Sequence, residues 1–210
     1  MSFQLRPADI LIQESIGKSL ASTLKRWALG SPYDHCFLYL GQIRFSDGPH
    51  GLQIPMLFES AGRGVVIQSL SRRYGQRVLV MRLNYETEIH RVLVEAITLA
   101  SEPKAFYDYL CILEFILPRL IFEKLGLPIP IKWQRNPWHV CSEAIFEVCY
   151  RAGLKDILPG NRVPLPADYV YSPLLYPVWE GVLNAEVVHL LPGHLYGKLP
   201  ALAVFDVPSV

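Results

Sequence analysis

The sequence around Cys141 constrains the fold more than any other stretch of the chain. Residues 134–137, a run that ends in proline, disfavour a helix, so a helix is expected to begin near Cys141. Ile145, Val148 and Cys149 then fall on one apolar face at helical spacing. The pattern predicts a half-buried helix with a thiol at its first position.

A thiol in this position has two interpretations. At a helix start, unpaired N–H groups and the positive end of the helix dipole favour the thiolate, which is the reactive form of cysteine. A cysteine in an apolar setting is also a common small core residue. A base brought close by the fold would favour a nucleophilic role for Cys141.

Composition limits the class of protein. The chain has 210 residues, of which 51% are apolar and 19% charged, and this suits a single domain over residues 1–210. The 20 Lys and Arg residues and 19 Asp and Glu residues leave a formal net charge of +1. Since no basic run interleaved with aromatic residues is present, no nucleic acid is expected as a partner.

The cysteines indicate a reducing compartment. They show no Cys-x-x-Cys spacing, and Cys141 and Cys149 would lie about 12 Å apart along a helix, too far for a disulfide. Residues 1–7 lack a basic region followed by an apolar core, so no cleavable export signal is visible. We expect a cytoplasmic protein, and export by another route stays open. The other two cysteines are Cys36 and Cys111.

The N-terminal region contains a predicted strand and a predicted amphipathic helix. Residues 8–13 have the pattern of a short apolar strand, and residues 15–29 carry an apolar stripe with basic residues beside it. Such a helix either packs on the core or rests on a membrane surface. Peripheral contact with a membrane is therefore one of two expectations for this helix.

A histidine opens the next predicted strand, residues 33–41. The alternation of side chains along a strand makes His35 and Cys36 point to opposite faces. This geometry argues against a zinc site built from His35, Cys36, His139 and Cys141, so no metal is expected. His35 is either a satisfied polar residue at a strand start or a catalytic base.

A carboxylate interrupts the apolar strand predicted at residues 54–61. The short connection favours antiparallel pairing with the strand of His35. If Glu59 shares a face with His35, its carboxylate can accept the second N–H of the imidazole and fix the orientation of the ring. The alternative is a glutamate on an edge strand that faces solvent.

The remaining elements have the pattern of scaffold. Residues 65–68 and 77–83 continue the sheet, and Asn84 or Thr87 is expected to cap a helix that runs through Glu102. Toward the C-terminus, apolar stretches predict two further strands. They span residues 185–191 and 201–207.

The segment at residues 104–131 is unusually apolar. Charged residues interrupt it and Pro118 would kink a helix, so it falls short of a membrane span. We expect a kinked helical pair that packs on the core. The functional alternative is a cap over a cleft that admits an apolar substrate.

Several short motifs follow one another in a characteristic order. They are Asp9-Ile10-Leu11, Tyr33-Asp34-His35, Phe58-Glu59-Ser60, Tyr107-Asp108, Cys141-Ser142-Glu143, Pro166-Ala167-Asp168 and Ser172-Pro173. The series resembles the circularly permuted branch of the NlpC/P60 papain-like superfamily. The likeness is greatest to the YiiX-like proteins and more distant to lecithin:retinol acyltransferase.

The resemblance implies an α+β fold, with a papain-like antiparallel sheet or partial barrel packed against helices and the nucleophile at a helix N-terminus. It implies Cys141 as nucleophile, His35 as base and Glu59 as third polar residue. No cofactor is expected. The family's glycine before the first aspartate is replaced by Ala8, and the glycine expected before Tyr107-Asp108 is absent.

These observations predict a cysteine peptidase or amidase that works through a thioester, with cell-wall-type peptides as one substrate class. The backbone N–H of Cys141 would supply one oxyanion donor, and Tyr33 and His139 are candidates for the second. A lipid acyl hydrolase or acyltransferase and a binding module without turnover are the alternatives. The expected partner is thus a peptide or a lipid-like acyl substrate, and the oligomeric state is not predicted.

Overall fold

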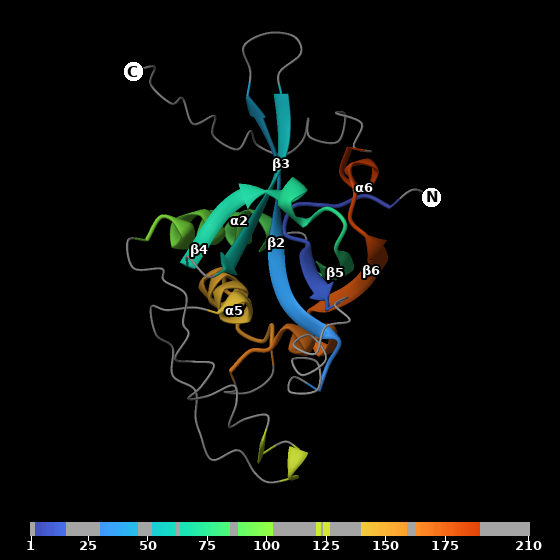
Figure 1. The fold of residues 1–210 in the computed structure, drawn as a ribbon. Coiled ribbons are helices and arrows are strands. Elements are labelled where there is room, and N and C mark those ends of the chain that lie inside the picture. The colour runs from blue at the N-terminus through green and yellow to red at the C-terminus, as the bar shows by residue number, and fades with distance from the viewer. Residues whose placement is uncertain are drawn as a thin grey trace.

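An antiparallel sheet forms the centre of the molecule (Figure 1). The computed structural model describes residues 3–15, 30–45, 52–61, 64–84, 88–102, 121–122, 124–126, 140–158 and 163–189. Within these ranges the sheet has six strands in the order β4-β3-β2-β1-β5-β6, and each pairs antiparallel to its neighbours. The strands are β1 (Ile10–Glu14), β2 (Tyr33–Phe45), β3 (Leu52–Ala61), β4 (Gly64–Ser69), β5 (Arg77–Leu83) and β6 (Leu175–Val182).

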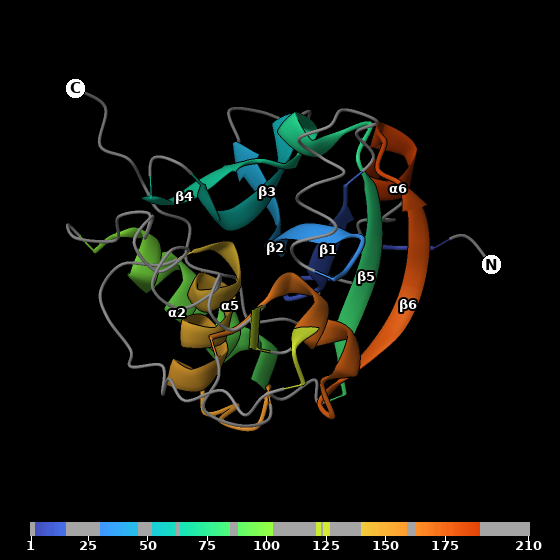
Figure 2. The ribbon, with the colours of Figure 1, turned by 60° about the horizontal axis from the view of Figure 1, so that its bottom comes forward.

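Of the described helices, one lies between β4 and β5, three lie between β5 and β6, and one follows β6. They are α2 (Ile89–Ala100), α5 (Cys141–Arg151) and α6 (Ala185–His189), together with the 3-10 helices η1 (Leu70–Arg73) and η4 (Pro166–Tyr171). The sheet curls, and α2 and α5 lie side by side within its curve (Figure 2).

Alternating side chains make both faces of the sheet apolar. Cys36 and Leu38 of β2 belong to one core cluster, and Phe37 and Tyr39 belong to another. This is the period-two pattern expected for a strand covered on both faces. The mixed α+β composition and the antiparallel sheet that the sequence predicts are confirmed.

The larger core cluster lies between the sheet and the helices. It joins Ile10 and Ile12 of β1 to Ala96 of α2, Ile145 of α5 and Tyr169 of η4, all of them buried. Each of the three isoleucine side chains stabilises the fold by about 1.5–3 kcal/mol when fully buried. This cluster fixes α5, and therefore its first residue, against the sheet.

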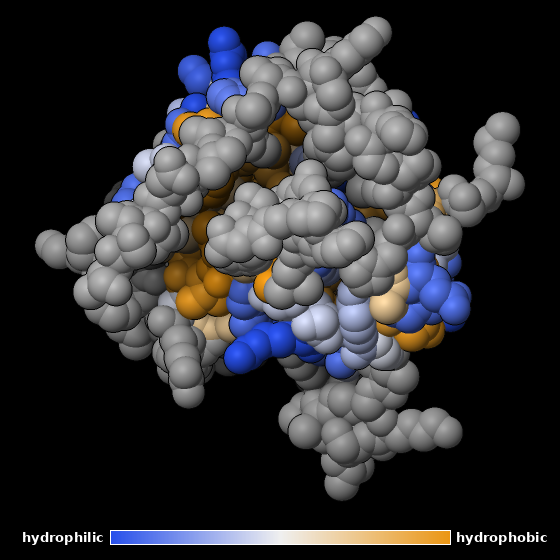
Figure 3. Space-filling model, turned by 90° about the horizontal axis from the view of Figure 1, so that it is seen from above, coloured by the Kyte–Doolittle hydropathy of each residue, from blue (hydrophilic) through white to orange (hydrophobic). Residues whose placement is uncertain are grey.

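The smaller core cluster covers the opposite face. Leu11, Leu57 and Val80 of the strands pack there with Leu70 of η1, and Trp179 of β6 borders them. Seen from above, hydrophobic residues of the described part form orange areas within the face, and hydrophilic residues are exposed nearer its edge (Figure 3).

The helix at Cys141 begins where the sequence predicts it, whereas other predictions are wrong. Residues 185–189 form α6 instead of a strand because the Oδ1 of Asn184 accepts a hydrogen bond from the N–H of Val187 at 3.0 Å, as a helix cap does. Asn84 does not cap α2, since its side chain donates to the carbonyl of Pro173. The residue at the N-cap is Glu88, which makes no side-chain cap bond.

Strand β6 was not predicted because Pro177 lies within it. Proline is tolerated at sheet edges and bulges, and β6 is an edge strand whose register with β5 shifts between Val80 and Met81. The bulge accommodates the missing N–H of this proline.

Several expectations fall outside the described residues. They concern the helix at 15–29 from residue 16 onward, nearly all of the segment 104–131, the strand at 201–207, Cys111 and His139. Among the helices that the structure describes, none has the length and apolar character to cross a membrane.

Candidate active site

The ladder between β2 and β3 ends before both strands do. Its pairs run from Phe45↔Leu52 to Leu38↔Phe58, whereas β2 continues to Tyr33 and β3 to Ala61. Beyond the last pair, β2 pairs with β1 and β3 pairs with β4. His35 and Glu59 lie on these two divergent strand ends.

Cys141 is the first residue of α5, directly after the N-cap Val140. The backbone N–H of Val140 donates to the Oε2 of Glu143 at 3.0 Å, and the N–H of Ala144 donates to the carbonyl of Val140 at 3.0 Å. These bonds fix the first turn of the helix. Cys141 is 7% exposed, which places its thiol just beneath the surface.

Two further bonds hold this helix start in place. The hydroxyl of Ser142 donates to the carbonyl of Pro164 at 2.6 Å, and the phenol of Tyr169 donates to the carbonyl of Ser142 at 2.7 Å. Ser142 and Tyr169 are buried. The start of the helix that carries the nucleophile candidate is therefore held by hydrogen bonds to two residues outside the helix.

His35 and Glu59 are in direct contact. The Nε2 of His35 lies 2.5 Å from the Oε2 of Glu59, and the glutamate side chain is fully buried. Its other oxygen, Oε1, accepts a hydrogen bond from the side-chain amide of Gln68. Since Nε2 faces the carboxylate, Nδ1 is the ring nitrogen left for the thiol of Cys141.

Arg73 of η1 completes the group. Its Nη2 donates to the Oε2 of Glu59 and lies 3.2 Å from the Nε2 of His35. The guanidinium also lies over the ring of Phe37, 5.7 Å from its centroid. The buried carboxylate thus has two cationic neighbours.

Cys36 and His35 both act on Cys141. The pKa of the Cys141 thiol is well below its usual value, chiefly because the thiol of Cys36 donates a hydrogen bond to it. The charge of His35, a hydrogen bond from its ring and one from the backbone N–H of Cys36 act in the same direction, and burial acts against them. The sulfur of Cys141 therefore interacts with two residues that point to opposite faces of β2.

The same contacts set the state of the other groups. Burial disfavours the charged imidazole, but Cys141 and Glu59 outweigh it and raise the pKa of His35 to about 9. Burial likewise disfavours the Glu59 carboxylate, but His35 and Arg73 lower its pKa below the usual value. The arrangement favours a thiolate beside an imidazolium.

The other described thiols stay protonated. Burial raises the pKa of Cys36 well above its usual value, and it raises the pKa of Cys149 to about 12. Both thiols are fully buried. Among the described cysteines, Cys141 alone has a thiol pKa below its usual value.

The two candidates for a second oxyanion donor have different outcomes. Tyr33 pairs with Glu14 in the sheet, and burial raises its pKa, followed by the charges of Glu180 and Glu14. Its side chain packs against the larger core cluster, to which Cys141 also belongs. His139 lies outside the described residues.

Sequence analysis missed Arg73, Gln68 and the hydrogen bond from Cys36. The strand register could have indicated Gln68, because it pairs with Leu57 and so shares the face of Glu59. Arg73 lies in a 3-10 turn whose position depends on tertiary packing. Among the described residues, no group of three or more His, Cys, Asp or Glu side chains is placed to hold a metal ion.

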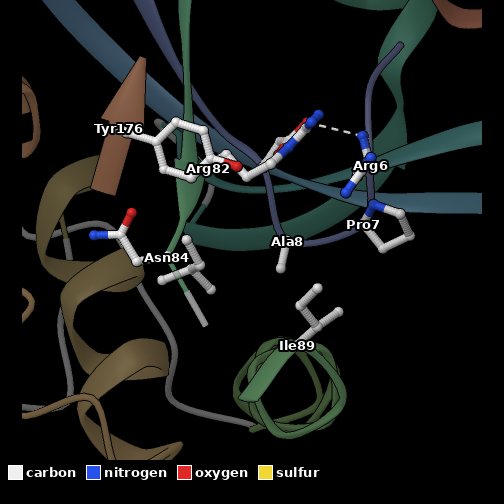
Figure 4. A pocket seen from close by; sticks show the side chains of 9 residues that line it. Arg6, Pro7, Ala8, Arg82, Asn84, Ile89 and Tyr176 are labelled. Carbon is white, nitrogen blue, oxygen red and sulfur yellow. Dashed lines mark hydrogen bonds and ion pairs between the residues drawn. The ribbon is translucent and has the colours of Figure 1, made fainter. Parts of the chain in front are cut away.

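A pocket of about 240 Å³ lies at the end of β1 that is opposite to the candidate active site (Figure 4). It is bordered by Ala8, Ile89 and Tyr176, and the Nε of Arg82 donates to the Oδ1 of Asp9 at 2.8 Å beside it. Ala8 has a φ of 67°, in the left-handed region that favours glycine. The described residues that line the pocket include neither cysteine nor histidine, so it is not the candidate active site.

Comparisons with known proteins give little further information. No family model matches the chain. No curated protein matches it. Among solved structures, the metalloprotein YiiX from Escherichia coli O157:H7 is similar at 17% identity, over 86% of this chain and 100% of that one, with a TM-score of 0.46.

Proposed function

We propose that the protein is a cysteine hydrolase that cleaves amide bonds, with Cys141 as nucleophile, His35 as general base and acid, and Glu59 as the group that orients His35. The observation that carries this proposal is the contact of the His35 ring with a fully buried carboxylate, on the strand whose edge borders the Cys141 thiol. This is the arrangement that activates a nucleophile through an oriented base.

The first half of the reaction forms a thioester. The Cys141 thiolate attacks the carbonyl carbon, and the resulting oxyanion accepts a hydrogen bond from the backbone N–H of Cys141 at the helix start. As the C–N bond breaks, the imidazolium of His35 gives its proton to the leaving nitrogen. The products are an acyl group on sulfur, a free amine and a neutral imidazole.

The second half hydrolyses the thioester. The neutral His35 takes a proton from water as the water oxygen attacks the thioester carbon. The C–S bond then breaks, and the Cys141 thiolate and the imidazolium are regained. Glu59 stabilises the imidazolium in both halves because it lies 2.5 Å from the ring.

The proposal includes a papain-like domain of the permuted NlpC/P60 type over residues 1–210. What supports it is a cysteine at the first residue of α5 and a histidine and a glutamate on neighbouring strands of an antiparallel sheet. Peptides, including those of the cell-wall type, are the substrate class we propose.

Incubation with defined peptides and with short-chain phospholipids tests the proposal. We expect release of free amine from a peptide, an acyl adduct on Cys141 by mass spectrometry, and loss of both in Cys141→Ala. The matched control is Cys149→Ala, which removes a buried thiol of the same helix and should retain activity. Release of fatty acid alone would contradict an amide hydrolase, and no adduct with any substrate would contradict turnover at Cys141.

A further inference from the structure

Arg73 and His35 share one buried anion. The Oε2 of Glu59 contacts the Nη2 of Arg73 and the Nε2 of His35, and the glutamate side chain is 0% exposed. A carboxylate in such a setting is tolerated only when it is paired and hydrogen-bonded. Two cations therefore compensate one charge.

The proposed reaction makes one of these cations temporary. His35 must lose its proton to the leaving group and regain it from water. If His35 were the sole cationic partner of Glu59, each loss of its proton would leave a buried carboxylate unpaired. An arginine keeps its charge under all conditions at which proteins fold.

We propose that Arg73 is a positioning residue that keeps the Glu59 carboxylate compensated while His35 gives up and regains its proton. This inference rests on the proposed function. When the proton of His35 passes to the leaving nitrogen, the ion pair of Arg73 and Glu59 remains intact. When His35 takes a proton from water, the pair again needs no change.

Several contacts hold the side chain of Arg73 in place. Its side chain is 22% exposed, and its guanidinium lies over the ring of Phe37. Phe37 in turn lies 6.0 Å from the ring of His35, on the same face of β2. One cation thus contacts the carboxylate, the imidazole and the aromatic ring beside it.

In the part of the chain that the structure describes, charged groups from three elements interact with His35. Glu59 of β3 and Cys141 of α5 favour the imidazolium. The Nη2 of Arg73 of η1 lies 3.2 Å from the Nε2 of His35, and a cation at this distance disfavours a second positive charge on the ring. On β1, the residue in register with His35 is the neutral Gln13. Arg73 is therefore the group from these elements whose removal should make His35 harder to deprotonate.

The test is the NMR titration of His35 in proteins with labelled histidine. In Arg73→Met we expect the midpoint to move upward by about one pH unit, because a neighbouring cation is removed. Arg73→Lys retains a cation, so its midpoint should lie close to that of the wild type. The matched control is Arg72→Met, which changes the exposed arginine next to it in η1 and should leave the midpoint unchanged. An unchanged or lower midpoint in Arg73→Met would overturn the inference.

A second variant guards against misfolding. Arg73→Met leaves Glu59 with a single cation, and Glu59→Gln combined with Arg73→Met removes both charges. In the double variant the midpoint of His35 should fall below that of the wild type, and a midpoint that rises would contradict the shared carboxylate.

The titration needs no substrate, so it separates this inference from the proposed function. If a substrate is turned over, Arg73→Met should lower kcat about tenfold with KM nearly unchanged, and Arg72→Met should change neither. Unchanged kcat in Arg73→Met would contradict the positioning role. Absence of turnover in the wild type would contradict the proposed function and not the titration.

Discussion

At the scale of single residues, the site depends on two adjacent side chains that approach one sulfur from different directions. His35 and Cys36 point to opposite faces of β2, as the alternation of a strand requires. Cys141 nevertheless interacts with both, and these two residues lie beyond the last pair of β2 with β3. The contact of Cys36 with the sulfur could not be predicted from the sequence, since it requires knowing where the ladder ends.

Cys36 should contribute to the acidity of Cys141. A hydrogen bond to a charged group is worth about 1.5–3 kcal/mol, so Cys36→Ala should lower the rate of Cys141 alkylation at pH 6 by about tenfold or more. Cys36→Ser retains a hydroxyl donor and should lie between the wild type and the alanine variant. Mass spectrometry of iodoacetamide-treated protein measures the rates, and equal rates in all three proteins would contradict a role for this thiol.

At the scale of elements, the start of α5 is supported from η4. Tyr169 donates a hydrogen bond to the carbonyl of Ser142, one residue after the nucleophile candidate. Both partners are buried, so the bond is shielded from water. The first turn of α5 therefore depends on η4, which follows α5 in the chain.

Tyr169→Phe should lower the free energy of unfolding by about 1 kcal/mol, the net value of one buried hydrogen bond. Tyr171→Phe is the matched control, because Tyr171 lies in the same 3-10 helix and is 81% exposed. Urea denaturation of the two variants measures the difference. Equal loss of stability in both variants would contradict a stabilising contribution from the hydrogen bond to Ser142.

The sequence predicts elements well where a pattern is local. The helix at Cys141 begins as predicted, and the predicted strands near β1 to β5 are present, because a proline boundary and apolar alternation are local signals. β6 was not predicted because a proline such as Pro177 disfavours a strand, and the bulge that accommodates it is not visible in the sequence. Arg73 escaped because its contact with Glu59 is purely tertiary.

At the scale of the whole molecule, a buried cluster of charges joins β2, β3 and η1. Glu59 carries the negative charge of this cluster, and Arg73 and His35 carry the positive ones. The cluster holds together strand ends that no longer pair with each other. Removing one of its charges should therefore affect the stability of the fold as well as the site.

Glu59→Gln should lower the free energy of unfolding by about 3 kcal/mol at pH 7. The folded-state pKa of Glu59 is lowered, so its contribution is present above about pH 4.5 and is lost as the pH falls through the folded value. The difference between variant and wild type should thus shrink in acid. Glu180→Gln, a change at an exposed residue paired with Arg77, should cost less than about 0.5 kcal/mol. Similar losses in both variants would contradict the buried cluster.

The ionisation of Cys141 tests the account most directly. For an ordinary thiol with a pKa near 8.5, the fraction present as thiolate falls about 75-fold between pH 8 and pH 6. The rate of iodoacetamide labelling at Cys141 in the wild type should fall by less than about threefold over this range, and His35→Gln should fall more steeply. A fall close to that of an ordinary thiol in the wild type would contradict the thiolate and imidazolium pair on which the proposed chemistry depends.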